Sequence, residues 1–510
     1  MKNTRFLLCM LTVGFCLSFF TSGVAAETKF SEKVTVSSDL VQDGWTLIPQ
    51  SLVSSPDSQH IAGVARKNKK FCIIFDGKVQ KTYDLIRKDT PVFSPDSKHY
   101  AYCARRGTKW HVVRDSKEEE GFDAVGLPRY SADSKRLAYI AEQGGKMLAV
   151  VDGVKQKAYE AVPEKGNFQF SPDSRSFAYV AALKKKTMVV ILNGTEQKAY
   201  SEVSIPTFSP DSKNLVYVGT DGEGKQFMVN NGKEGPRYER IGVYAFSPDC
   251  KRFAYTATLK GKGFMVVDGK EGPRFTDVAI PIFSDDSKKL VYLAQEGEKS
   301  IMVFDGVQGQ KYDMIRQFAF SPDSAHTIMT VKKGSKWSAI VDGKEGAQYD
   351  EVLFNPYATA FSPDSKHYAV MMKKGDKFAW GLDGVPGPFY DVVYPVPLFS
   401  PDSKQFVYMA QKGKKWVIVR NGKESKEYDQ VNFPRFTPDS KHFMFMSFEN
   451  DLWSVVIDGV ASKGKLAMIL PGAAIDFKNN RSVSIPGYQI RVTGPSTISQ
   501  KAMRLDVSIE

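Results

Sequence analysis

Histidine and cysteine are both scarce in this chain of 510 residues, which has six histidines and five cysteines. Cys9 and Cys16 fall within the first twenty residues, and Cys72, Cys103 and Cys250 are widely spaced. This spacing gives neither a disulfide framework nor a zinc-ligand cluster. A single Cys72–Cys103 bridge stays open in an oxidising compartment, and unreactive, buried thiols are the simpler expectation.

Sequence signatures of catalysis are also missing. There is no Gly-x-Ser-x-Gly nucleophile elbow and no His-Glu-x-x-His zinc helix. Equivalent positions in a circular repeat lie on a circle, so we expect the recurrent histidines to stay apart and not to share a metal ion. We therefore predict no catalytic residue, no cofactor and no metal site. Five of the six histidines stand three residues after a recurring aspartate: His60, His99, His326, His367 and His442.

Only one long apolar run occurs, and it lies at the start of the chain. Phe6 to Phe20 follows the cations Lys2 and Arg5, and a small-residue segment ends at Ala26. This order is typical of an export signal, with residues 1–26 removed and the mature chain periplasmic or secreted. Cleavage lowers the formal charge from +13 to +11. No later stretch is apolar enough to cross a bilayer.

The most prominent feature that the sequence does contain is a repeat. Phe-Ser-Pro-Asp-Ser-Lys or a close variant recurs in eleven copies, and neighbouring copies are 37 to 41 residues apart. A fixed period of this size decides the fold before any local argument. Its aspartates are Asp57, Asp96, Asp133, Asp173, Asp211, Asp249, Asp286, Asp323, Asp364, Asp402 and Asp439.

Each copy predicts four short strands, a to d. In the second copy, strand a at 91–93 meets the Ser-Pro-Asp-Ser turn, where proline presets φ and the aspartate caps its own turn. Strand b at 98–104 and strand c at 110–113 flank a basic turn. Between c and d, ten copies carry Asp-Gly or Asn-Gly, the strongest short signal for a type I′ hairpin, and the second carries Asp115-Ser116. Four-stranded units at this period predict an all-β protein made of β-propeller blades.

Eleven or twelve blades exceed the usual 4 to 8 of one ring. We therefore predict two consecutive rings, at 27–280 and 281–510, with one very large ring as the alternative. The segment 475–480 stands where another turn would fall, and alternating residues follow it up to 509. We interpret this region as a degenerate twelfth blade closed by strands from both termini, including 33–36.

The Phe-Ser-Pro-Asp-Ser-Lys units resemble the repeats of TolB-like propellers and of the N-terminal propellers of tricorn-type proteases. The resemblance covers nearly all of the mature chain and implies a propeller fold and, from TolB-like proteins, a binding role in the cell envelope. Two features depart from it: serine replaces the usual turn glycine, as at Ser97, and Asp-Gly-Lys-Glu-Gly segments recur, as at 268–272.

Cations concentrate in the b–c turns. If the blades form a ring, these turns gather on one face, where their summed charge would attract anions. The alternative is that lysine and glycine simply make soluble turns. The candidate binding face comprises Arg66, Lys67, Lys69, Lys70, Arg105, Arg106, Lys109, Lys184, Lys185, Lys186, Lys332, Lys333, Lys336, Lys373, Lys374, Lys377, Lys412, Lys414 and Lys415.

These observations predict a non-enzymatic, monomeric propeller that binds a protein in the cell envelope. The first alternative is a polyanion or glycan binder that uses the lysine-rich face. The second is a propeller enzyme, such as a polysaccharide lyase or hydrolase. Nucleic acid is not an expected partner, because the chain is exported and has no basic helix.

Overall fold

The protein is an all-β structure built from antiparallel sheets. The computed structural model describes residues 30–39, 44–57, 59–162, 168–184, 187–355, 360–463, 466, 468–469, 482–494 and 497–509. In these ranges the strands form twelve sheets of four or five strands, and the only helical element is a short 3-10 turn, η1 (Pro49–Ser51). The sheets confirm the predicted propeller blades, and we number them 1 to 12.

Blades 1 to 6 follow one another along the chain. Blade 1 holds β2 (Thr46–Leu47), β3 (Val53–Ser54), β4 (Ile61–Lys67), β5 (Lys70–Phe75) and β6 (Lys78–Tyr83); blade 2 holds β7 (Leu85–Ile86), β8 (Val92–Phe93), β9 (Tyr100–Arg106), β10 (Lys109–Arg114) and β11 (Lys117–Phe122); blade 3 holds β12 (Ala124–Val125), β13 (Arg129–Tyr130), β14 (Leu137–Gln143), β15 (Lys146–Val151) and β16 (Val154–Lys155); blade 4 holds β17 (Phe168–Phe170), β18 (Phe177–Lys184), β19 (Thr187–Leu192) and β20 (Thr195–Glu196); blade 5 holds β21 (Glu202–Val203), β22 (Thr207–Phe208), β23 (Leu215–Thr220), β24 (Gln226–Asn230) and β25 (Lys233–Glu234); blade 6 holds β26 (Arg240–Phe246), β27 (Phe253–Leu259), β28 (Lys262–Val267) and β29 (Lys270–Glu271).

The second half continues the pattern. Blade 7 holds β30 (Asp277–Val278), β31 (Ile282–Phe283), β32 (Leu290–Glu296), β33 (Lys299–Phe304) and β34 (Val307–Tyr312); blade 8 holds β35 (Met314–Phe320), β36 (Thr327–Lys333), β37 (Lys336–Val341) and β38 (Lys344–Glu345); blade 9 holds β39 (Glu351–Leu353), β40 (Ala369–Lys374), β41 (Lys377–Leu382) and β42 (Val385–Tyr390); blade 10 holds β43 (Val392–Val393), β44 (Leu398–Phe399), β45 (Phe406–Lys412), β46 (Lys415–Arg420) and β47 (Lys423–Glu424); blade 11 holds β48 (Gln430–Phe436), β49 (Phe443–Glu449), β50 (Leu452–Ile457) and β51 (Val460–Ala461); blade 12 holds β1 (Phe30–Asp39), β52 (Met468–Ile469), β53 (Ser482–Gly494) and β54 (Thr497–Ile509).

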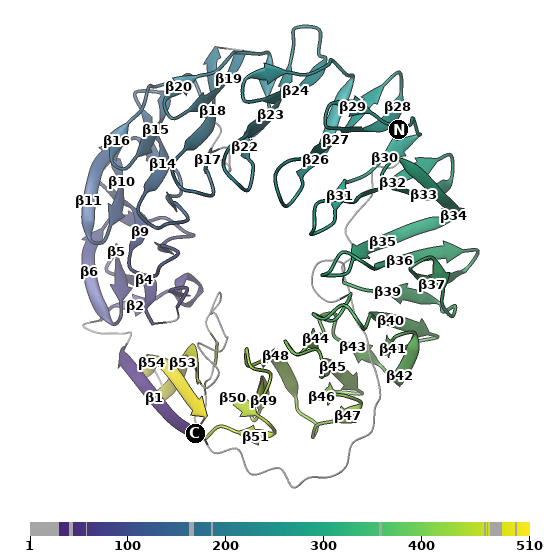
Figure 1. The fold of residues 1–510 in the computed structure, drawn as a ribbon. Coiled ribbons are helices and arrows are strands. Elements are labelled where there is room, and N and C mark those ends of the chain that lie inside the picture. The colour runs from purple at the N-terminus through teal and green to yellow at the C-terminus, as the bar shows by residue number, and fades with distance from the viewer. Residues whose placement is uncertain are drawn as a thin grey trace.

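The blades stand side by side around a single wide opening, with strand a innermost and strand d outermost (Figure 1). This is the large single ring that we gave as the alternative, and the predicted division at residue 280 is wrong. The proposed join falls inside blade 7, because β30 and β31 both pair with β32. Buried side chains also connect blade 6 to blade 7 and blade 7 to blade 8, so the packing is continuous there.

Blade 12 joins the two ends of the chain. Strand β1 pairs antiparallel with β54, and β53 lies on the other side of β54. This confirms the predicted closure of a twelfth blade by terminal strands, although β53 and β54 are longer than those of the other blades. The segment 475–480 and the signal segment 1–26 lie outside the described residues.

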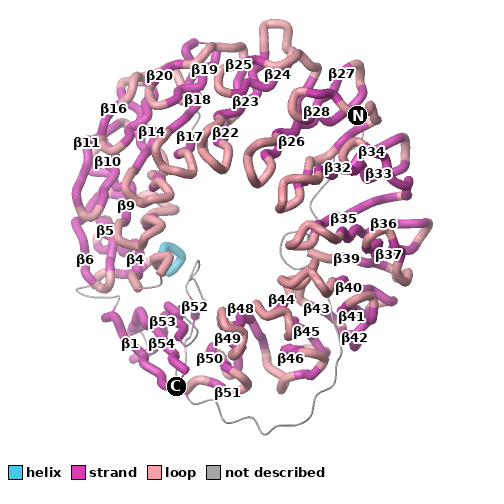
Figure 2. Tube along the Cα trace, in the orientation of Figure 1, coloured by secondary structure: helices cyan, strands magenta, loops and turns pink. Residues whose placement is uncertain are grey.

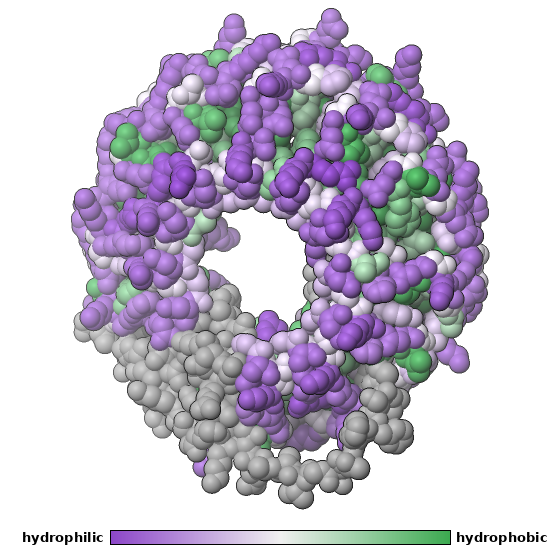
Figure 3. All heavy atoms as spheres, in the orientation of Figure 1, coloured by the Kyte–Doolittle hydropathy of each residue, from purple (hydrophilic) through white to green (hydrophobic). Residues whose placement is uncertain are grey.

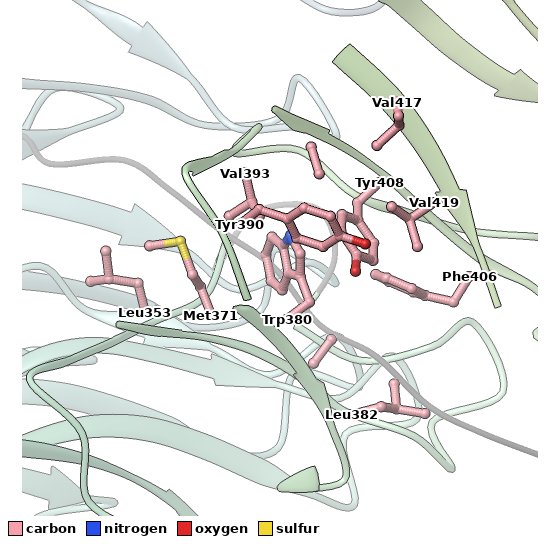
Figure 4. Packing of buried hydrophobic residues seen from close by; sticks show 12 residues of the cluster. Leu353, Met371, Trp380, Leu382, Tyr390, Val393, Phe406, Tyr408, Val417 and Val419 are labelled. Carbon is pink, nitrogen blue, oxygen red and sulfur yellow. The ribbon is translucent and has the colours of Figure 1, made fainter. Parts of the chain in front are cut away.

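Neighbouring blades bury their faces against each other, because one sheet cannot bury both of its faces alone. Figure 4 shows one such contact, where Trp380 of blade 9 lies among Tyr390, Phe406 and Tyr408. Trp380 is fully buried, and its ring centroid is 6.0 Å from that of Tyr408. Each large apolar side chain buried in this way stabilises the fold by about 1.5–3 kcal/mol.

Tight hairpins connect the strands (Figure 2). The Asp-Gly turns have positive φ at both central residues, such as 46° at Asp76 and 75° at Gly77, which confirms the predicted type I′ geometry. The tryptophans at the start of strand c pack between blades: Trp337 is buried, and Trp110 and Trp416 lie against buried clusters. No helix in the described residues is long and apolar enough to span a membrane.

Candidate binding faces

The b–c turns gather on one face of the ring. In every blade the antiparallel order places the b–c turns and the d–a connections at one end, and the a–b and c–d turns at the other.

Hydrogen bonds link the b–c end from blade to blade. Asp84, which follows strand d of blade 1, accepts from Lys70 Nζ of its own blade at 2.5 Å and from the backbone amide of Gly107 in blade 2 at 2.7 Å.

This carboxylate bridge recurs around the ring. Asp123, Asp313, Asp350 and Asp391 each accept from a lysine of their own blade and from a glycine amide of the next. The lysine is the main cause of the lowered pKa of Asp84, Asp123 and Asp350, with the glycine amide second. Sequence reasoning missed the bridge, although an aromatic residue followed by aspartate at the end of strand d signals it.

Many of the predicted face cations therefore have local partners. Ion pairs hold eight of them: Lys70, Arg106, Lys109, Lys333, Lys336, Lys377, Lys412 and Lys415. Arg105 lies over the Trp110 ring and Lys373 over the Phe378 ring. Lys67 and Lys332 are half-buried.

The remaining candidate cations are more accessible to a ligand. In the part of the chain that the structure describes, five are exposed and form no ion pair: Arg66, Lys69, Lys184, Lys374 and Lys414. Lys185 and Lys186 lie outside the described residues. The b–c face thus carries bound acid–base pairs with free cations between them, which lowers its net charge below what the cation count suggests.

The opposite face carries the Ser-Pro-Asp-Ser turns. Asp96 Oδ1 accepts from Ser94 Oγ at 2.6 Å and from the amide of Lys98 at 3.1 Å, which confirms that the aspartate caps its own turn. The Ser94 hydroxyl is the main cause of the lowered pKa of Asp96. Each turn is therefore rigid before any ligand approaches.

A second set of bonds joins these turns between blades. The Ser97 hydroxyl accepts from the amide of Asp57 in the preceding blade, and we call each such contact a serine latch. The latch explains the use of serine at this turn position: φ at Ser97 is 65°, which glycine tolerates better, but only serine supplies the acceptor. The other latch serines are Ser134, Ser174, Ser212, Ser287, Ser324, Ser365, Ser403 and Ser440.

The series is interrupted at blade 6, where Cys250 takes the place of the serine with φ of 58°. Among the described residues no hydrogen bond joins Cys250 to the amide of Asp211.

Cys72 and Cys103 are also free thiols, and they are buried in different clusters on either side of a blade boundary. The bridge between them that we left open is not formed.

The recurrent histidines also lie on this face. Each Nδ1 is 2.7 Å from the aspartate of the c–d turn in its own blade, as between His60 and Asp76. His60 and His99 line the same pocket between blades 1 and 2. The circular argument separates distant blades, but adjacent blades bring equivalent positions together. No group of residues suited to a metal ion occurs among those described.

Sequence reasoning also missed a ring of cations on this face. The residue after the latch serine is lysine or arginine in most blades, and the side chain reaches only the aspartate of its own turn, at 3.4–3.9 Å. Side-chain exposure is 75–87% for Arg175, Lys213, Lys251, Lys288, Lys366, Lys404 and Lys441. Both faces are therefore basic, and the charge asymmetry between them is smaller than the b–c turns alone indicate.

The innermost strands carry a third feature. In blades 5 and 7 strand a is split in two, and in blade 6 its register shifts between Ile241 and Tyr244. Residues that leave the ladder there bulge away from strand b, on the side of the central opening (Figure 1). Ile205, Val243 and Ile280 occupy these bulges in three consecutive blades and are 40%, 45% and 55% exposed.

Comparisons with known proteins identify no family for this chain. No family model and no curated protein matches the chain. Among solved structures it is similar to a eukaryotic initiation factor, with 13% identity over 59% of this chain and 88% of that one and a TM-score of 0.34. It is also similar to the β-propeller domain of the Trilobed protease from Pyrococcus furiosus, with 14% identity, coverage of 51% and 94%, and a TM-score of 0.25. The Dos1 propeller matches at 12% identity, coverage of 55% and 81%, and a TM-score of 0.26.

Proposed function

We propose that this chain is an exported, non-enzymatic propeller that binds a protein partner in the cell envelope and serves as a scaffold. The observation that carries the proposal is the row of exposed apolar side chains Ile205, Val243 and Ile280 beside the central opening. Blades 10 and 11 add Tyr394, at 40% exposure, and Phe433, at 38%, on equivalent bulges. Grouped apolar side chains on a soluble surface mark protein interaction sites.

The surroundings of these residues support this choice. Hydrophilic residues cover most of the visible face, and hydrophobic ones form separate patches (Figure 3). The repeated aspartates cap their own turns, the serines form latches between blades, and the histidines contact an aspartate of their own blade, which leaves few of these groups for chemistry. A ring that is rigid at every turn presents its inner wall with little loss of conformational entropy on binding.

The cellular setting rests on the sequence. The resemblance of the repeats to TolB-like propellers, together with the predicted export signal, supports a partner in the envelope and a chain in the periplasm or outside the cell. We expect the scaffold to be monomeric and to bind no nucleic acid.

Two triple variants test this function. The first variant combines Ile205→Ser, Val243→Ser and Ile280→Ser. It removes the exposed apolar side chains beside the central opening. The matched control changes three exposed valines of outer d strands to serine: Val154, Val307 and Val385, which are 62%, 70% and 58% exposed.

The mature protein is used to capture partners from an envelope extract, and a captured protein is then purified and titrated calorimetrically against each variant. We expect the inner triple variant to lose at least about tenfold in affinity, because anchors of this kind contribute more than 1 kcal/mol each. The control should bind like the wild type. Equal binding by both variants would refute these apolar side chains as the interface.

A second candidate function is the binding of a polyanion. It is favoured by the exposed cations Arg66, Lys374 and Lys414, which form no ion pair among the described residues. Binding of heparin, used as a probe polyanion, should then weaken steeply between low and physiological salt. Changing these three residues to glutamate should abolish it, and an affinity insensitive to salt would exclude this function.

A further inference from the structure

Beside a pocket of about 370 Å³ between blades 3 and 4, the structure has a second interface pocket, of about 380 Å³. It lies between blades 1 and 2, on the face that carries the a–b and c–d turns, and both blades line it. Its volume is within the range of about 300–1,000 Å³ that small-molecule sites occupy.

The floor of the pocket is aromatic. The ring of Phe75 from blade 1 stacks on Tyr100 from blade 2, with centroids 4.5 Å apart and an interplanar angle of 19°. His60 stacks on Phe75 at 5.4 Å, and Phe93 lies 6.1 Å from it. Phe75 and Phe93 are only partly buried, so apolar ring surface faces the pocket.

The rim of the pocket is polar, with groups held in fixed positions. His60 and His99 use Nδ1 to contact Asp76 and Asp115 at 2.7 Å, and Nε2 of neither histidine has a protein partner among the described residues. On the other side, the Ser116 hydroxyl donates to Gln80 Oε1 across the blade boundary at 2.8 Å. The rim therefore offers imidazole, amide and hydroxyl groups at set positions.

This combination occurs once in the eleven repeats. Ser116 stands where the ten other repeats have glycine, and its φ is 67°, so a serine is retained at a position that suits glycine. Blades 8 and 9 also carry histidines at the equivalent positions, His326 and His367. There, however, Val341 replaces Phe75, and glycines replace Gln80 and Ser116.

The charge around the pocket argues against an anionic ligand. The carboxylates of Asp76 and Asp115 border the histidines, and Asp96 lies in the adjoining turn. Among the described residues that line the pocket, Lys98 is the only lysine or arginine. A ligand that presents an apolar face to the aromatic floor and neutral hydroxyls to the rim fits these groups.

We propose that this pocket binds a neutral pyranose. The C–H face of the sugar packs on Phe93 and on the part of the Phe75 ring that His60 and Tyr100 leave exposed, and its hydroxyls bond to the histidine Nε2 atoms, Gln80 and Ser116. The site is independent of the proposed scaffold function, since it lies on a turn face and not on the wall of the opening. Its failure would leave the partner-capture experiment untouched.

Ligand-detected NMR and calorimetry on the mature protein test the proposal. The probes are the methyl glycosides of glucose, galactose, mannose and N-acetylglucosamine, a tetrasaccharide of each, and glucuronate as the charged comparison. We expect saturable binding of at least one neutral glycoside and weaker binding of glucuronate. Tighter binding of the tetrasaccharide would assign the sugar to a glycan chain, and equal binding would assign it to a free sugar.

Two variants and a control locate the binding. Ser116→Gly restores the turn of the other repeats and should keep the fold while it weakens binding. Phe75→Val copies Val341 and should weaken binding by about tenfold through loss of the stacking surface. Phe304→Val changes the equivalent position of blade 7 and should leave binding unchanged. Absence of binding by every neutral glycoside, or equal binding by Phe75→Val and Phe304→Val, would overturn the proposal.

Discussion

The hydroxyl of Ser97 in blade 2 accepts a hydrogen bond of 3.0 Å from the backbone amide of Asp57 in blade 1. The bond joins two turns that are 40 residues apart in sequence and adjacent in the ring. It accounts for a residue whose backbone conformation favours glycine. The same contact at eight further boundaries makes the serine latches a repeated clamp between blades.

The first prediction concerns a single latch, Ser134, which accepts from the amide of Asp96. Ser134→Ala removes the acceptor and retains a side chain at φ of 65°, so we expect a loss of roughly 1–2 kcal/mol in the free energy of unfolding. Ser134→Gly loses the same bond but relaxes the backbone by about 1 kcal/mol, so its loss should be smaller. Thermal unfolding of both variants checks the order, and an alanine variant at least as stable as the glycine variant would contradict it.

The second prediction uses the interruption of the series at blade 6. Cys250→Ser places a hydroxyl where the amide of Asp211 lacks a latch partner, and we expect a gain of about 0.5–1.5 kcal/mol. Cys250→Ala is the control, because it removes the thiol without adding an acceptor. The melting temperature should rise for serine relative to alanine, and equal values would show that the turn geometry at blade 6 does not admit the latch.

Much of the fold was predictable because it follows from local chemistry. The Asp-Gly turns and the Ser-Pro-Asp-Ser caps each depend on residues close in sequence, and both are present. The number of rings was not predictable in this way. Closure depends on the small rotation between adjacent blades, which is set by packing such as that of Trp380 on Tyr408 and leaves no periodic signal in the sequence.

The candidate binding face of the b–c turns was likewise only partly predictable from the sequence. The cations of the b–c turns were plain in the sequence, but the acids that bind them lie on other strands, as Asp84 does for Lys70. The pocket between blades 1 and 2 could be suspected only from Asp115-Ser116, the one departure from the Asp-Gly pattern. Its second half, Phe75 with Gln80, belongs to a different repeat, and the sequence alone does not pair them.

The third prediction concerns the thiols. Burial raises the pKa of both Cys72 and Cys103 to about 12, so neither forms a reactive thiolate near neutral pH. Cys250 is only partly buried and should be the one thiol of the folded protein, from Glu27 onward, that reacts with a maleimide. We expect one rapid equivalent in buffer and three in denaturant. Rapid reaction of two or three thiols in buffer would contradict the burial of strands β5 and β9.

The fourth prediction concerns pH and a contact between blades 4 and 5. Glu234 accepts hydrogen bonds from Lys198 Nζ at 2.6 Å, from Arg237 Nη2 at 2.6 Å and from the Tyr200 hydroxyl at 2.9 Å. Lys198 first, then Arg237 and Tyr200, lower the pKa of Glu234 from 4.5 to about 2. A carboxyl with a lowered pKa stabilises the folded state above its unfolded pKa and loses that contribution as the pH falls towards the folded pKa.

Glu234→Gln should therefore melt below the wild type at pH 7, and the difference should shrink between about pH 4.5 and pH 2, because the wild-type carboxylate is protonated there. Glu223→Gln is the control: Glu223 is exposed in the neighbouring 221–225 hairpin, and in the described structure its carboxylate forms no ion pair. Its melting temperature should track the wild type at every pH. Scanning calorimetry across this range decides the matter, since a difference for Glu234→Gln that stays constant or grows in acid would mean that the carboxylate does not clamp the two blades.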